Sequence, residues 1–171
     1  SGLFRDCLLK PALEPPEQIV KDIRDIERED LDGITAVVHL AGLSNDPLGE
    51  VDQSLTEAIN YDGSMRLGEL AREAGVRRLV YASSQSMYGR AATGAELEED
   101  TSEKNPLTAY ARTKWEAEQG LLALRSSGFE VTALRPSTVY GSSPRLRCDI
   151  VFNNFVACAY TTGAIEIKSD G

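Results

Sequence analysis

The chain has 171 residues, of which 42% are hydrophobic and 26% charged, a composition typical of one globular domain and not of a disordered chain. Its net charge of −9 argues against nucleic acid and anionic membrane surfaces as partners. Three cysteines without a CxxC spacing, a single histidine, no apolar run of membrane-spanning length and no signal-peptide pattern together predict a cytoplasmic protein without a metal site.

The first 50 residues predict loops and two short strands. Three prolines favour a loop before residue 20. Residues 20–26 are typical of a short strand, and the charged residues 26–32 of a short helix. Residues 34–42 form an apolar run of strand length that ends in small residues.

The rest of the chain alternates between helical and extended patterns. Apolar residues recur at helical spacing in the longer segments, and strand-length apolar runs separate them. The predicted elements are a helix at 51–74, a strand at 76–84, a helix at 108–125, a strand at 130–141, a helix at 151–163 and a strand at 164–169. This order predicts an α/β doubly wound parallel sheet, because helices of this length can form right-handed crossovers.

Small and hydroxylated residues follow three of the predicted strands, in the segments HLAGLS, YASSQS and LRPSTVYG. In open parallel sheets, ligands bind outside the carboxyl ends of the strands. Small residues there let a flat ligand approach the backbone. We therefore expect a ligand-binding cleft at this edge.

Tyr110 and Lys114 are four residues apart at the start of a predicted helix, so their side chains share one face. A nearby cation favours the phenolate and lowers the pKa of a tyrosine, which is otherwise a poor base. The hydroxyl of Ser84 could complete a proton-transfer group. The alternative is an amphipathic tyrosine beside a solvated lysine, with Ser83 or Ser84 capping the next turn.

Other polar residues near the predicted strand ends each have two interpretations. Asp22 is either a turn former or a hydrogen-bond acceptor for an exocyclic amine. Asn60 lies inside a helix, where asparagine is mildly unfavourable, which hints at a hydrogen-bonding role. Arg145 and Arg147 either clamp a diphosphate or form a solvated basic turn. His39 is interpreted as a structural histidine rather than a base.

The segments HLAG, the IN of TEAIN, YASSQSMYG, YARTK and LRPSTVYG, in this order and spacing, resemble the extended short-chain dehydrogenase/reductase family. The similarity is to its NAD-dependent epimerase/dehydratase branch, which acts on nucleotide sugars. It implies a Rossmann-like sheet, a nucleotide-sugar substrate and NAD as cofactor. NADP is the alternative, because the residue that selects between the two cofactors is not in the sequence.

The resemblance also implies roles for individual residues. Ser84 would hydrogen-bond the reacting sugar oxygen, Tyr110 would be the catalytic acid/base, and Lys114 would hold the nicotinamide ribose and lower the pKa of Tyr110. The remaining implied cofactor contacts are Asp22 and Ile23 at the adenine, Ala41 and Gly42 at the pyrophosphate and ribose, Asn60 bracing the strand ends, and Pro136 at the nicotinamide. The remaining implied substrate contacts are Gln85, Ser86, Thr138 and Arg145.

The chain departs from the family pattern in two places. No GxxGxxG turn is present, so we expect an interior fragment with a Rossmann-like domain that is incomplete at the N-terminus (1–145) and the start of a substrate-binding lobe (146–171). Such a chain alone is expected to be inactive, and to form a homodimer through helices 51–74 and 108–125.

The second departure concerns the chemistry. In family members that dehydrate the sugar, an Asp-Glu pair follows the strand hydroxyl, whereas Gln85 and Ser86 stand here. This disfavours dehydration and leaves an epimerase that acts through a transient ketosugar. The alternatives are a dehydrogenase that stops at the ketone and a non-catalytic dinucleotide-binding or regulatory protein.

Overall fold

The computed structural model describes residues 17–43, 52–90, 96–143 and 146–167, so Arg145 lies outside the described residues. The chain divides into two compact units. One contains residues 19–137, and the other contains the described residues before 19 and after 137. The domain boundary expected after residue 145 stays a prediction. None of the helices described here combines the length and hydropathy needed to cross a bilayer.

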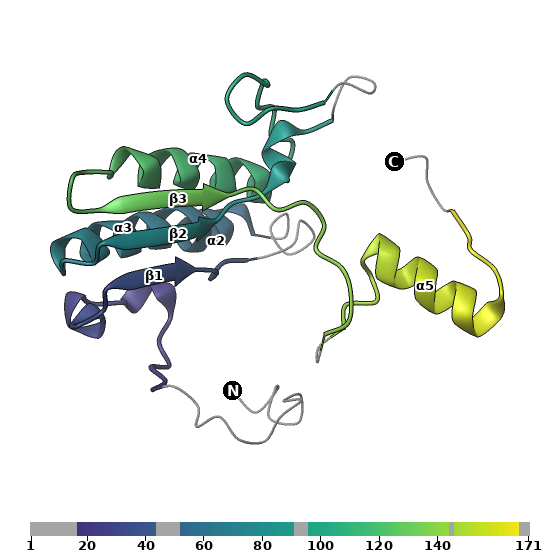
Figure 1. Ribbon diagram of the computed structural model, residues 1–171, viewed down its shortest axis with the longest axis horizontal. Helices are drawn as coiled ribbons and strands as arrows, with labels where there is room; N and C mark the ends of the chain where they lie inside the picture. The colour runs from purple at the N-terminus through teal and green to yellow at the C-terminus, as the bar shows by residue number, and fades with distance from the viewer. Residues whose placement is uncertain (1–16, 44–51, 91–95, 144–145, 168–171) are drawn as a thin grey trace. The chain divides into compact units, whose positions relative to one another are not determined.

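A parallel sheet forms the centre of the 19–137 unit (Figure 1). Its strands are β1 (Ala36–His39), β2 (Arg78–Ala82) and β3 (Glu130–Leu134), in the order β1-β2-β3. His39 pairs with Tyr81, which pairs with Ala133. The sheet therefore confirms the predicted parallel α/β arrangement.

The strands are shorter than the sequence predicted, although the hydrogen bonding continues past their ends. The Ser83 N–H donates to Leu134 O at 2.8 Å, and the Gln85 N–H donates to Pro136 O at 3.3 Å. Pro136 itself has no N–H to continue a ladder. The two segments that follow β2 and β3 thus stay side by side beyond the carboxyl ends of the strands.

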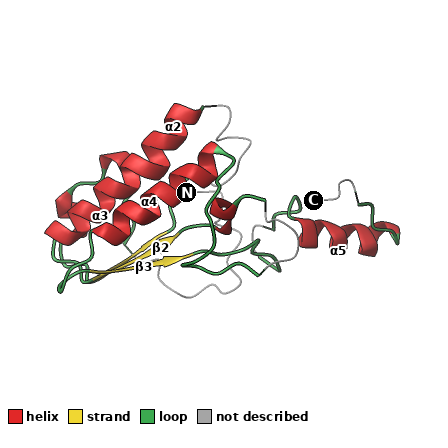
Figure 2. Ribbon diagram, turned by 90° about the horizontal axis from the view of Figure 1, so that it is seen from above, coloured by secondary structure: helices red, strands yellow, loops and turns green. Residues whose placement is uncertain are grey.

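Helices cover one face of this sheet (Figure 2). They are α2 (Gln53–Glu57), the π-helical η4 (Ala58–Asp62), α3 (Gly63–Glu73) and α4 (Ala109–Ala123). Their apolar residues pack on the sheet residues that point toward them. The buried cluster includes Leu67, Ala71, Ala117 and Leu121 from the helices and Leu79, Tyr81 and Val131 from the strands.

Two glycines let α3 and α4 approach each other closely. A Cβ on Gly68 would collide with the side chain of Leu121, and a Cβ on Gly120 would collide with the side chain of Met65. The opposite face of the sheet presents Val38 and Leu134, each more than half exposed. Among the described residues, the helices of this unit lie on one face of the sheet only.

The strand predicted at 20–26 is wrong. The structure has a 3-10 helix, η2 (Ile23–Asp25), and a second one, η3 (Arg28–Leu31), where the sequence predicted a short helix. Asp22 caps η2 by accepting from the Arg24 N–H at 2.9 Å. Ile23 and Ile26 both pack against the core. Residues three apart face the same side in a 3-10 turn but opposite sides in a strand.

The other unit contains α5 (Val151–Thr162), which ends at Gly163 with a φ of 72°. Tyr140 stacks on Phe152 with ring centroids 4.5 Å apart, and the two line an apolar cavity of about 400 Å³ beside α5. The strand predicted at 164–169 is wrong for residues 164–167, which form no strand. There the Ala164 N–H donates to Thr162 Oγ1 at 3.3 Å, a turn-like bond that continues from the helix end.

Candidate active site

Helix α4 carries Tyr110 and Lys114 in its first two turns. The helix begins where it does because Thr108 caps it: the Thr108 Oγ1 accepts from the Ala111 N–H at 3.1 Å. Tyr110 is half-buried and Lys114 is buried. The cap thus fixes the start of the helix on which both side chains share one face.

Lys114 is a buried cation, and no carboxylate in the part of the chain that the structure describes pairs with it. Its side chain is 6% exposed, and its Nζ lies 4.4 Å from the centroid of the Tyr81 ring. Among the described residues, the ammonium has no ion pair or hydrogen bond. Burial lowers the pKa of Lys114 to about 8, because the charged form loses its hydration. The contact with the Tyr81 ring face offsets only part of that loss.

Tyr81 of β2 lies beside Lys114. Burial raises the pKa of its phenol well above the usual value, and the nearby Tyr110 contributes to the rise. Tyr81 therefore stays neutral. The Lys114 ammonium lies over the Tyr81 ring, so the lysine of α4 reaches β2 near its carboxyl end.

Ser84 begins η5 (Gln85–Tyr88), the short 3-10 helix that follows β2. Its Oγ accepts from the Ser86 N–H at 3.2 Å and from the Ser86 hydroxyl at 2.8 Å. The proton of the Ser84 hydroxyl is not used in either bond. Ser84 is half-buried, whereas Ser83 is 3% exposed and its Oγ has no hydrogen-bond partner among the described residues. Of the two serines, Ser84 is the one that a ligand can reach.

Asn60 connects η4 to the segment that follows β1. Its Oδ1 accepts from the Leu43 N–H at 2.8 Å, and its Nδ2 donates to the Leu43 carbonyl at 3.2 Å. Asn60 therefore ties η4 to the segment after β1, and its expected role beside the cofactor stays a prediction. The residue lies in η4, and π-helical turns inside α-helices are frequent at functional sites. The sequence predicted a regular helix here and missed the π turn.

Gly42 lies close to Asn60 and Lys114. A Cβ at this position would lie 3.0 Å from Asn60 Oδ1 and 4.0 Å from Lys114 Nζ. Ala41 and Gly42 are both exposed. A larger side chain at residue 42 would crowd the Asn60 side chain and approach the Lys114 ammonium.

His39 is structural, as predicted. It is 2% exposed, and its Nε2 lies 2.8 Å from Ser64 Oγ. The Ser64 hydroxyl donates to the Asn60 carbonyl at 2.7 Å, so the histidine is the donor in the first bond. Burial chiefly, and Lys114 to a smaller extent, lower the pKa of His39 to about 4. The neutral ring therefore anchors β1 to the π turn.

The other expected cofactor and substrate residues lie at several places. Asp22 is exposed, and Arg24 already holds its carboxylate through Nε at 2.9 Å and Nη2 at 2.8 Å. Ile23 packs beside Gly63 on α3. Pro136 and Gln85 are exposed, on the adjacent segments that follow β3 and β2. Thr138 is exposed and belongs to the other unit.

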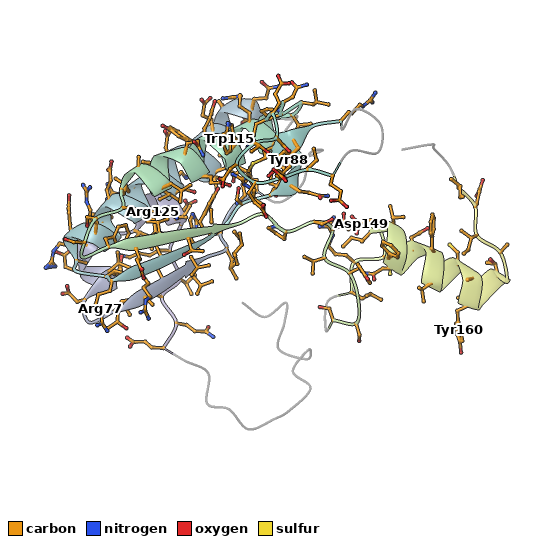
Figure 3. All side chains as sticks on the ribbon, turned by 45° about the horizontal axis from the view of Figure 1, so that its top comes forward. Arg77, Tyr88, Trp115, Arg125, Asp149 and Tyr160 are labelled. Carbon is orange, nitrogen blue, oxygen red and sulfur yellow. The ribbon has the colours of Figure 1, made fainter. Side chains whose placement is uncertain are left out.

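The sequence interpretation missed one polar cluster next to this site. Arg135 precedes Pro136 and contacts Glu118 of α4 and Tyr88 of η5. Figure 3 shows Tyr88 and Trp115 on neighbouring segments near the start of α4. Glu118 follows Lys114 by one helical turn on the buried face of α4. This spacing could have predicted from the sequence that Glu118 is a buried carboxylate that needs a cationic partner.

Comparison with known proteins identifies the family. Residues 18–171 match the model of the NAD dependent epimerase/dehydratase family. The chain belongs to this family. A UDP-glucuronate 4-epimerase of Thermodesulfobacterium geofontis is 34% identical over 147 residues, which cover 81% of this chain and 42% of that protein. The sterol demethylase protein B of Methylococcus capsulatus is 32% identical over 128 residues, which cover 73% of this chain and 38% of that protein.

A solved member of the family has the same fold. The structure of MoeE5 in complex with UDP-glucose and NAD superposes with a TM-score of 0.73 and 34% identity, over 90% of this chain and 51% of that one. The Rossmann-like sheet implied by the sequence resemblance is thereby confirmed. The chain spans about two fifths of the length of the two curated relatives.

Proposed function

We propose that this chain, in a protein that also supplies a glycine-rich pyrophosphate-binding segment, belongs to an NAD-dependent epimerase of nucleotide sugars. The observation that carries the proposal is the buried ammonium of Lys114 on the Tyr110 face of α4, which no described residue pairs, in a member of the NAD dependent epimerase/dehydratase family. A buried cation without a carboxylate is unfavourable unless a ligand or a reacting group uses its charge.

The described residues fit the nicotinamide-ribose end of NAD. Gly42 has no side chain and lies beside Asn60 and Lys114, and a ribose hydroxyl bound near it could accept from the Lys114 ammonium. Pro136 offers an apolar border for the nicotinamide. We assign Ala41 to the ribose and pyrophosphate. NAD would supply reversible hydride transfer, and NADP is the alternative.

The proton chemistry falls to three side chains. Tyr110 accepts the proton of the sugar hydroxyl while the carbon of that hydroxyl loses its hydride, which leaves a ketosugar. Lys114 stabilises the Tyr110 phenolate electrostatically, and Ser84 donates its unused proton to the sugar oxygen. When the ketosugar presents its opposite face, return of the hydride and of the Tyr110 proton gives the epimer.

Other substrate contacts follow from the same assignment. Gln85 and Ser86 offer amide and hydroxyl groups where dehydration would need an acid and a base. Thr138 and Arg145 are assigned to the substrate. Asp22 and Ile23 are assigned to the adenine, although an adenine amine would compete with Arg24 for the Asp22 carboxylate.

The test is product analysis in deuterated water, with a protein that includes the pyrophosphate-binding segment. The reactants are NAD and the nucleotide sugars that relatives are named for, UDP-glucuronate and UDP-glucose. We expect the 4-epimer, without net NADH and without solvent deuterium at the inverted carbon, because the same hydride returns. Accumulating NADH and ketone would instead establish a dehydrogenase, and NAD binding without turnover a non-catalytic protein. This chain alone, without a pyrophosphate segment, is expected to give no product.

A homodimer through the outer faces of α2–α3 and α4 is a further part of the proposal. Tyr61, Trp115 and Gly120 line a groove of about 540 Å³ between these helices, where side chains of a second copy would fit. Sedimentation velocity should show a dimer that Gln119→Arg, at an exposed residue of the same groove, converts to a monomer. A wild-type monomer at micromolar concentration would contradict the proposed dimer.

We also propose a cytoplasmic location, and residue 145 as the end of the dinucleotide-binding domain.

A further inference from the structure

Arg135 and Glu118 form the most buried ion pair among the described residues. Glu118 is 1% exposed at its side chain and Arg135 is 15% exposed. The Glu118 Oε1 accepts from Nε at 3.1 Å and from Nη2 at 2.6 Å. This two-point contact needs the planar guanidinium, which a lysine cannot reproduce.

The remaining nitrogen of Arg135 holds two further segments. Its Nη1 donates to the Tyr88 hydroxyl at 2.6 Å and to the Glu99 carbonyl at 2.7 Å. Lys104 donates to the same carbonyl at 2.7 Å. Both cations lie within 6 Å of the ring centres of Tyr88 and Trp115.

These contacts join the segments that carry the proposed reacting groups. Glu118 lies on α4, one turn after Lys114, and Tyr88 ends η5, which Ser84 begins. The loop behind η5 is held closely as well: Asn105 N–H donates to Met87 O at 2.9 Å, and a Cβ on Gly89 would collide with the Asn105 carbonyl. One guanidinium therefore connects α4, η5, the 96–105 loop and the end of β3.

We propose that Arg135 is a positioning residue that fixes the Ser84 turn relative to Tyr110 and Lys114. Removing its side chain leaves Glu118 buried and unpaired and frees η5 from α4. The core strands, which pack through other residues, keep their positions. The catalytic meaning of this placement rests on the proposed function, but the placement itself can be measured without turnover.

The test is amide hydrogen exchange in Arg135→Met. Three amides report on the turn: Gln85, Gly89 and Asn105, whose N–H groups donate to Pro136, Ser86 and Met87. We expect them to exchange about 10- to 100-fold faster, the range for losing a hydrogen bond to a charged group. Core amides such as Leu79 should change less. Equal acceleration of all amides, or none at the three reporters, would overturn the proposal.

A matched control and a milder variant complete the experiment. Arg125 also donates to a backbone carbonyl, that of Val131, at the opposite end of the sheet from Tyr88 (Figure 3), so Arg125→Met should leave the three reporter amides unchanged. Tyr88→Phe removes a single hydroxyl, and keeps the test decisive if Arg135→Met does not fold. It should accelerate Gly89 exchange several-fold, and unchanged exchange there contradicts the proposal.

Turnover separates positioning from general stability. In a protein that epimerises, Tyr88→Phe should lower kcat several-fold with little change in KM, because substrate still binds while Ser84 is misplaced. A variant with altered exchange but unchanged kcat would show that the cluster holds the turn without positioning Ser84 for the reaction. That result would overturn the inference and leave the proposed function standing.

Discussion

Tyr110→Phe is expected to lower kcat by about 10²- to 10⁴-fold, the contribution typical of a positioned general acid or base. The substitution removes one hydroxyl and keeps the ring. Because Tyr110 is half-buried on a helix that Thr108 caps, the fold should be preserved. KM should change little, since the lost interaction involves the proton in flight and not the bound sugar. Initial rates of epimer formation, in a protein with the pyrophosphate segment, measure both constants.

Tyr160→Phe is the matched control. Tyr160 is 91% exposed on α5, so loss of its hydroxyl should leave kcat and KM unchanged (Figure 3). Wild-type kcat in Tyr110→Phe would remove Tyr110 from the proton-transfer step. The proposed reaction would then need another base at the sheet edge.

Lys114→Met is expected to make the protein more stable at pH 7 and to abolish turnover. Burial holds the pKa of Lys114 at about 8, against 10.5 when it is exposed in the unfolded chain. At about 1.4 kcal/mol per pKa unit, the buried charge destabilises the fold at pH 7 by up to about 3 kcal/mol. Methionine has a similar length without the charge and suits an irregular apolar space. Urea unfolding, followed by the fluorescence of Trp115, measures the free energy of unfolding.

The destabilisation caused by the buried Lys114 charge depends on pH. Between pH 8 and 10.5 the unfolded chain still binds a proton that folded Lys114 has released, so the free energy of unfolding of the wild type rises with pH. Below pH 8 both states are protonated and the destabilisation is complete. The Lys114→Met variant should lack this rise, so its advantage should be greatest below pH 8 and vanish near pH 10.5.

Lys21→Met is the control for this prediction. Hydrogen bonds to Asp30 and then Glu27 raise the pKa of exposed Lys21, so its charge favours folding, opposite to Lys114. Its removal should not increase stability at pH 7. A Lys114→Met protein less stable than wild type at pH 7 would contradict the picture of an uncompensated buried cation.

The sequence correctly predicted the helices and strands whose apolar residues recur at a regular spacing. It was wrong where the local backbone departs from that spacing. Apolar residues at helical spacing predicted α3 and α4, and strand-length apolar runs predicted the three strands. The π turn around Asn60 was missed, because apolar spacing predicts a regular helix there and carries no information on the Asn60 contact with Leu43, 17 residues away. The strand expected at 20–26 failed because Asp22 caps a 3-10 turn.

By itself, the sequence determined the α/β class, the family and the Tyr110–Lys114 spacing, since these depend on periodicity and on motifs that are contiguous in the chain. Only the tertiary structure decided that Ser84 rather than Ser83 is accessible, that Lys114 is buried without a counter-ion among the described residues, and that Arg135 joins α4 to η5. The physical reason is that accessibility and pKa depend on neighbours from distant segments. Lys114 illustrates this, because its pKa follows from burial against Tyr81 of β2, which the spacing of YARTK does not contain.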